Sequence, residues 1–233
     1  MRKVLMFLAL AAMSTLGWAA DNPKAQAEER LKNAATVLQE IAAAPDKGIP
    51  NEVLDGAKCI AIVPRLVQAG FVFGGKHGRG VATCRTATGW SAPAFFTISG
   101  GSWGLQIGVE GVDLVMMIMN KQGMDHLMAN KFQIGGEASA AAGPVGRHAS
   151  ANTDWKASTE MLTYSRSKGL FAGISLGGSW VARDADAMDV FYGANTSNTA
   201  VLTGEVKPPA AASEFLANVR TVTATAQAKK AEK

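Results

Sequence analysis

The sequence predicts an α+β fold in which an antiparallel sheet of many short strands, curved or barrel-like, packs against an N-terminal and a C-terminal helix. Three observations predict it. A helical stripe of apolar residues comes early, a series of short apolar runs separated by glycines follows, and a second amphipathic segment comes last. Because strands and helices do not alternate regularly, a doubly wound parallel sheet is disfavoured.

Residues 1–19 are predicted to be a cleaved signal peptide. Arg2 and Lys3 give a positive start, an apolar run follows at 4–12, and the small residues Gly17 and Ala19 suit the cleavage site. The run is too short to cross a bilayer as a helix. We therefore expect residues 20–233 to form a single exported domain, periplasmic or secreted, with any membrane contact peripheral.

The first element of this domain is predicted to be a helix that begins at Asn22-Pro23, an N-cap followed by proline at the first helical position. Its apolar stripe has the 3.6-residue period of a helix face that packs on a sheet. The stripe consists of Ala27, Leu31, Ala34, Ala35, Leu38, Ile41 and Ala42. Pro45, Gly48 and Pro50 end this helix, and a short helix is expected over 51–56.

Strand-length runs rich in Val, Ile and Phe begin at Lys58, and glycines within them or at their edges predict bulges, tight bends or close approach of the backbone. A short helix is expected over 123–130 and a helical turn over 184–192. Further strands are expected over 132–134, 138–142, 162–165 and 170–176. After Pro208-Pro209, Ser213 is predicted to cap a last helix, and residues 224–233 are expected to form a frayed tail.

The chain has two cysteines, Cys59 and Cys84, each in a strand-like run. In an exported protein two thiols often pair, and a bond closing this loop would stabilise the fold by about 3 kcal/mol. Two buried free thiols are the alternative, because sequence does not show whether the residues are close in space. Both interpretations stay open.

The distribution of charge is more informative than its total. With 23 Lys+Arg against 19 Asp+Glu, the net charge of +4 is too small to indicate nucleic-acid binding. From Gly56 to Val109, however, there is no acidic residue. Five cations lie in this span, Lys58, Arg65, Lys76, Arg79 and Arg85, and aromatic residues interleave with them: Phe71, Phe73, Trp90, Phe95, Phe96 and Trp103. The pattern predicts either a basic, membrane-facing surface or a solvated face whose acids come from other segments.

Motifs for catalysis are weak. Gly100-Gly101-Ser102-Trp103-Gly104 matches the nucleophile elbow of serine hydrolases, but a strand-like run follows it where a helix is required. Ser165 opens an S-x-x-K match without its usual partner motifs. His77, His126 and His148 do not have metal-ligand spacing. We therefore expect no enzyme, no metal site and no cofactor.

A family resemblance rests on longer strings. Tyr164 to Ser179, YSRSKGLFAGISLGGS, resembles the signature of the SYLF (Ysc84-type) domain, and Ala57 to Pro64, AKCIAIVP, resembles its opening strand. Similar blocks follow in the family's order at Gly78-Arg79-Gly80, 104–108, Gly136 and 143–146. The likeness covers about residues 25–222, nearly all of the predicted domain.

The resemblance implies a non-enzymatic lipid-binding domain, since eukaryotic members bind phosphoinositides and some bind actin. Because the predicted signal peptide suggests a bacterial exported protein, we expect recognition of anionic phospholipid and not of actin. The candidate headgroup contacts are Arg65, Lys76, Arg79, Arg85, Arg166 and Lys168. For Arg166 and Lys168 the alternative is a structural tie to a carboxylate. A structural protein of the cell envelope that binds a protein partner is the second hypothesis.

Overall fold

The computed structural model describes residues 22–44, 48–145, 159–167, 170–171 and 174–231. In chain order its elements are α2 (Pro23–Ala42), α3 (Asn51–Gly56), β1 (Cys59–Thr86), β2 (Gly89–Trp90), β3 (Ala94–Ile118), α4 (Lys121–Met128), β4 (Lys131–Gln133), β5 (Ala140–Ala142), β6 (Met161–Ser167), β7 (Leu170–Phe171), β8 (Trp180–Arg183), α6 (Ala185–Tyr192), α7 (Asn198–Leu202), a 3₁₀ turn (Ala210–Ala212) and α8 (Ser213–Ala231). The predicted α+β class, the curved sheet and the two terminal helices are confirmed. The predicted signal peptide lies outside the described residues.

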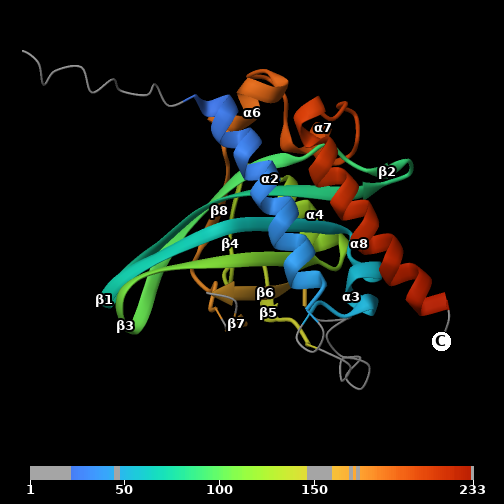
Figure 1. Ribbon diagram of the computed structural model, residues 1–233. Helices are drawn as coiled ribbons and strands as arrows, with labels where there is room; N and C mark the ends of the chain where they lie inside the picture. Colours follow the sequence, from blue (N-terminus) through green and yellow to red (C-terminus); the bar gives the residue numbers. More distant parts are fainter. Residues whose placement is uncertain (1–21, 45–47, 146–158, 168–169, 172–173, 232–233) are drawn as a thin grey trace, which may run out of the picture.

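Two very long strands dominate the sheet and correct the expectation of many short ones. β1 has 28 residues and β3 has 25. They pair antiparallel from Cys59↔Ile118 to Ala82↔Ala94, and the resulting ribbon bends back on itself well beyond the helices (Figure 1). The glycines that suggested strand ends lie inside the ladder, because a glycine allows a strand to bend without breaking its hydrogen bonds.

Shorter strands extend the ribbon on both halves of β3. β6 pairs with one half of β3 and β8 with the other. β5 runs parallel to β6, which departs from the predicted antiparallel arrangement. In the described residues the sheet has eight strands. β8 and α7 were not anticipated from the sequence, because four or five residues are too few to show a period.

The two ends of β1 meet, although they lie 25 residues apart in the sequence. Cys59 and Cys84 form a disulfide, and the amide of Arg85 donates to the carbonyl of Lys58 at 2.8 Å. Both cysteines are fully buried. The bend of the ribbon therefore brings the second half of β1 over the first.

The helices α2 and α8 lie side by side across one face of the ribbon (Figure 1). The Asn22 side chain caps α2 by accepting from the amides of Lys24 and Ala25. Leu31, Leu38 and Ile41 are buried between the helix and the sheet. This burial accounts for the apolar stripe of α2 as core packing.

The last helix is longer than the sequence indicated. α8 runs to Ala231, so the described part of the segment 224–233, which we expected to be frayed, is helical. Ala226 is buried, which explains how packing holds this part of the helix. Among the described residues no helix is both long and apolar enough to cross a membrane.

Candidate functional site

Lys76 does not lie on a surface. Its side chain is buried, with 5% of its area exposed, and Nζ donates to the carbonyl of Ser175 at 2.6 Å. Burial lowers the pKa of the Lys76 ammonium group. A ligand at the surface could not reach this ammonium, so Lys76 is removed from the predicted basic face.

The Arg85 guanidinium binds backbone carbonyl groups of the fold and does not point outward to a ligand. Its Nε donates to the carbonyl of Ala57 at 2.9 Å, and Nη2 donates to that of Leu54 at 3.1 Å. The guanidinium also lies over the Trp90 ring, 4.7 Å from its centroid. Arg85 therefore binds the carbonyl oxygens at the end of α3, where helices leave acceptors unsatisfied. Partial burial lowers the pKa of this arginine.

Arg166 is paired with two carboxylates. Its Nη2 contacts the carboxylate of Glu40 and lies 3.2 Å from Oδ2 of Asp113. The hydrogen bond to Glu40 is the main reason that the pKa of Arg166 is raised. This geometry is the structural tie that the sequence left open as the alternative to headgroup contact. Lys168 lies outside the described residues.

Six aromatic residues are predicted to interleave with the basic face, and the side chains of three of them, Phe71, Phe73 and Trp103, lie outside what the structure describes. Trp90, Phe95 and Phe96 are buried in the core. The acid-free span of sequence is thus not an acid-free surface in the fold, because Glu40 and Asp113 enter it from α2 and β3. Of the candidates in the described residues, two keep exposed side chains: Arg65 and Arg79.

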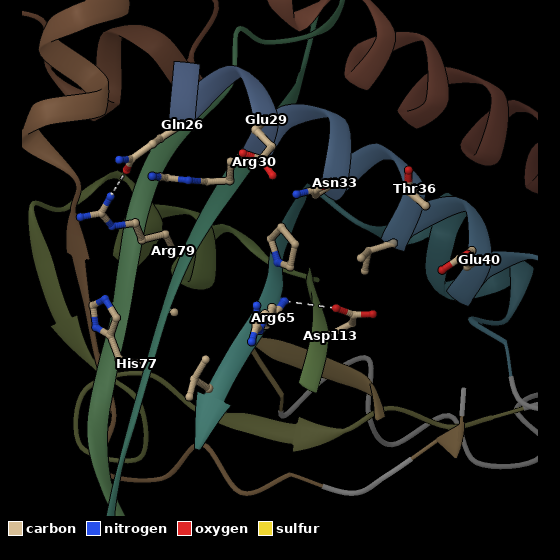
Figure 2. A pocket seen from close by; sticks show the side chains of 14 residues that line it. Gln26, Glu29, Arg30, Asn33, Thr36, Glu40, Arg65, His77, Arg79 and Asp113 are labelled. Atoms are coloured by element: carbon tan, nitrogen blue, oxygen red, sulfur yellow. Dashed lines mark hydrogen bonds between the residues drawn. The ribbon is translucent and has the colours of Figure 1, made fainter. Parts of the chain in front are cut away.

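Arg65 and Arg79 both line a groove between α2 and β1 with a volume of about 720 Å³. Figure 2 shows polar side chains of α2 along one wall and Arg65, His77 and Arg79 along the other. We call these the helix wall, which comprises Gln26, Glu29, Asn33, Thr36 and Glu40, and the strand wall, which comprises Arg65, His77 and Arg79.

Strand alternation turns Arg79 into the groove. Gly78 and Gly80 occupy the opposite, buried face, where the second half of β1 packs on the first. A Cβ at Gly78 would lie 2.6 Å from Cγ1 of Val63, and one at Gly80 would lie 2.7 Å from the carbonyl oxygen of Ile62. Because glycine is required on the inner face, the outer face carries the only side chains of this segment. Arg79 then donates from Nη1 to Oε1 of Gln26 at 2.9 Å.

A β-bulge turns Arg65 into the same groove. The pairing register of β1 with β3 shifts between Val63 and Leu66, and Arg65 has a φ of 59°, in the left-handed region. Its amide donates to Oδ1 of Asp113 at 3.1 Å, which holds the bulge. The side chain passes over Gly111, where a Cβ would lie 3.1 Å from Cγ of Arg65. Its guanidinium makes no hydrogen bond or ion pair with the described residues.

The helix wall was missed in the sequence, although its signal was present. Gln26, Glu29, Asn33, Thr36 and Glu40 follow the three- and four-residue spacing of one helix face. Arg30 also borders the groove but turns inward, where Nη1 forms an ion pair with Asp184 at 2.8 Å. Burial lowers the pKa of Arg30, and the pairing with Asp184 opposes that shift.

The serine motifs lie in strands. Ser102 falls inside β3, which continues to Ile118 with no helix after the motif, and Ser165 is buried within β6. Neither serine therefore has the local structure that its motif requires. Within the described ranges, no group of three or more His, Cys, Asp or Glu side chains is placed to hold a metal ion.

Comparison with known proteins agrees with the signature string. The Ysc84 family, described as "Las17-binding protein actin regulator", matches residues 99–222. Protein YSC84 of Saccharomyces cerevisiae is 37% identical over 175 residues, which are 73% of this chain and 37% of that protein. SH3 domain-containing YSC84-like protein 1 of Homo sapiens is 33% identical over 191 residues, which are 79% of this chain and 56% of that protein.

The chain therefore spans 37% of the yeast relative and 56% of the human one. LAS seventeen-binding protein 3 of Saccharomyces cerevisiae gives the same picture, with 36% identity over 71% of this chain and 37% of its own length. The matched segment contains β6 with the YSRS residues, and the longer alignments extend over most of the domain. These matches confirm the resemblance: the chain belongs to the Ysc84 family, whose unit is the SYLF domain.

Proposed function

We propose that the protein is a non-enzymatic module of the cell envelope that binds phosphate groups of anionic phospholipids in the groove between α2 and β1. The observation that carries this proposal is that Arg65 and Arg79, from the two halves of β1, both line one groove. Guanidinium groups bind phosphate oxygens through charge-assisted hydrogen bonds. Arg79 uses one nitrogen on Gln26, which leaves its other donors for a ligand.

The protein's own carboxylates near the two arginines do not compete with a ligand phosphate. Asp113 and Glu40 are already paired with Arg166, so they do not neutralise the guanidinium of Arg65. The imidazole of His77 is exposed beside Arg79 and adds a further polar group to the strand wall. The predicted signal peptide is the reason to place this activity in the periplasm or outside the cell.

Vesicle co-sedimentation tests the proposal. We expect the protein to bind phosphatidylcholine vesicles that contain phosphatidylglycerol, to bind pure phosphatidylcholine much less, and to lose affinity as salt is raised. Each cation near a charged surface contributes about 1 kcal/mol, so the Arg65→Gln/Arg79→Gln variant should bind about 10- to 30-fold more weakly.

The matched control is Lys76→Met, which removes a buried cation from the same strand. It should leave vesicle binding unchanged, because the Lys76 ammonium is turned away from the groove. Equal binding by the double arginine variant and the unaltered protein would refute the groove as the lipid site. Absence of binding to either kind of vesicle would refute lipid recognition itself.

A protein partner is the second candidate, favoured by the family description as a Las17-binding protein and actin regulator. In an envelope protein it would take the form of a structural or interaction module. Affinity purification with and without detergent separates the two functions. A stoichiometric protein that stays bound in detergent, together with an absence of vesicle binding, would favour this second candidate.

A further inference from the structure

The groove holds an acid as well as its two arginines. Three of the charges at its border are satisfied within the fold: Arg30 pairs with Asp184, and Glu40 and Asp113 pair with Arg166. Glu29 is exposed on the helix wall, and its carboxylate makes no hydrogen bond or ion pair with the described residues. The charges left for a ligand are therefore two guanidiniums on the strand wall and one carboxylate on the helix wall.

Glu29 lies on the same helix wall as Gln26, the partner of the arginine that binds phosphate in the proposed function. Gln26, which accepts from Arg79 at 2.9 Å, is three residues before Glu29 on α2. Side chains three apart on a helix are neighbours, with Cβ atoms about 5–6 Å apart. Figure 2 shows Glu29 and Asn33 next to each other along the same wall. Along the groove from Gln26, the carboxylate of Glu29 is thus about one helical turn away and the side-chain amide of Asn33 about two turns away.

A bare anion fits this arrangement poorly, because the carboxylate of Glu29 would repel it. A polyol headgroup could donate hydrogen bonds to Glu29 and Asn33 but would leave the negative charge of Glu29 uncompensated. A primary ammonium group supplies both the opposite charge and three hydrogen-bond donors. In phosphoethanolamine this ammonium is two carbons from the phosphate ester oxygen, a span that suits neighbouring side chains on one helix face.

We propose that the groove is selective for phosphate esters that carry a primary ammonium group, with Arg65 and Arg79 on the phosphate and Glu29 on the ammonium. This inference rests on the proposed function, since it needs the arginines to bind phosphate. The inference assigns ligand specificity to Glu29, which lies on the helix wall and not on the strand wall. The same chemistry occurs in free phosphoethanolamine and in aminophospholipid headgroups, which the experiment distinguishes.

The test compares O-phosphoethanolamine with ethyl phosphate, which keeps the phosphate monoester and lacks the ammonium, by NMR titration of the protein's backbone amides. We expect the first ligand to bind five- to tenfold more tightly. Glu29→Gln should bring the two affinities together without weakening ethyl phosphate. Arg79→Gln should weaken both. Glu28→Gln, which removes a charge from the adjacent position that does not line the groove, should preserve the preference.

Vesicles then identify the source of the headgroup. Phosphatidylserine and phosphatidylglycerol carry the same net charge, but only phosphatidylserine has an ammonium group. Tighter binding to phosphatidylserine vesicles, lost in Glu29→Gln, supports an aminophospholipid. Discrimination between the soluble ligands without a vesicle preference supports a free phosphate ester as the ligand.

The failure of each proposal gives a different result. Equal affinities for O-phosphoethanolamine and ethyl phosphate in the unaltered protein would overturn the inference and leave phosphate binding in place. The inference also fails, with phosphate binding intact, if Glu28→Gln abolishes the preference as fully as Glu29→Gln does. If neither soluble ligand nor any anionic vesicle binds, the proposed function falls together with the inference.

Discussion

Arg166 and Glu40, which lie 126 residues apart in the sequence, form an ion pair that ties β6 to the end of α2. The same guanidinium nitrogen lies 3.2 Å from Asp113, whose other oxygen accepts the amide of Arg65. One arginine of the signature string therefore connects the helix wall of the groove to the bulge that presents Arg65. Its role in this structure is to position the groove.

Replacing Arg166 should destabilise the protein. Arg166→Met leaves two carboxylates facing each other without a cation, and we expect the free energy of unfolding to fall by about 1–3 kcal/mol. Urea denaturation followed by circular dichroism measures this change. Arg220→Met, which alters an exposed arginine of α8, is the control and should change stability by less than about 0.5 kcal/mol. Equal stabilities of the two variants would contradict the positioning role.

The disulfide between Cys59 and Cys84 should hold the bend of β1 closed. Removing it with a Cys59→Ala/Cys84→Ala variant should lower the free energy of unfolding by about 3 kcal/mol, since the bond closes a loop across a sequence separation of 25. Chemical denaturation measures the loss. Thiol titration of the denatured, unreduced protein supplies the control, and two reactive thiols there would show that the bond does not form.

Gly80 should not tolerate a methyl group. In Gly80→Ala the new Cβ would lie 2.4 Å from Cζ of Phe96 and 2.7 Å from the Ile62 carbonyl oxygen. Overpacking of this kind costs about 1–3 kcal/mol, and thermal denaturation should show it as a lower Tm. Gly101→Ala is the matched variant in the same ribbon, because no atom lies within 4 Å of its Cβ position. A Tm for Gly80→Ala as high as that of Gly101→Ala would argue against the close crossing of the two halves of β1.

Both tyrosines should resist ionisation until the protein unfolds. Burial raises the pKa of Tyr164 and of Tyr192, the two tyrosines of the chain, above the usual value of 10. The unfolded state therefore loses these protons first, so the free energy of unfolding falls as the pH rises above 10. Absorbance at the tyrosinate band, followed together with circular dichroism, should show ionisation and unfolding in one step. Ionisation of either tyrosine at pH 10 in the folded protein would contradict the burial of its ring.

The two terminal helices could be predicted from the sequence because their signals are local. Asn22 and Pro23 mark the start of α2, and Ser213 marks the start of α8. The lengths of β1 and β3 could not be predicted from the sequence, since a glycine such as Gly74 or Gly101 is consistent both with a turn and with a bent strand. The choice depends on pairing with a distant partner, and Gly74↔Ser102 is such a pair.

The candidate site was predicted in part, and the reason lies in which face each residue takes. Lys76 and Arg79 are three apart on one strand and so point to opposite sides of the sheet, although both belong to the acid-free span. Glycines lie between and beside His77 and Arg79, so the sequence already indicated that these two side chains share the exposed face of the strand. The carboxylates of Glu40 and Asp113 could not have been placed, because they reach the groove from elements distant in the sequence.

The division of α2 into a buried apolar stripe and a separate polar helix wall has a consequence for how this protein could diversify. Gln26, Glu29, Asn33 and Thr36 line the groove without belonging to the core that joins the helix to the sheet. Opposite them, the strand wall is constrained by the glycines behind it. Substitutions along this one side of α2 can therefore change which ligand the groove binds at little cost to folding. New ligand preferences should arise at these positions first.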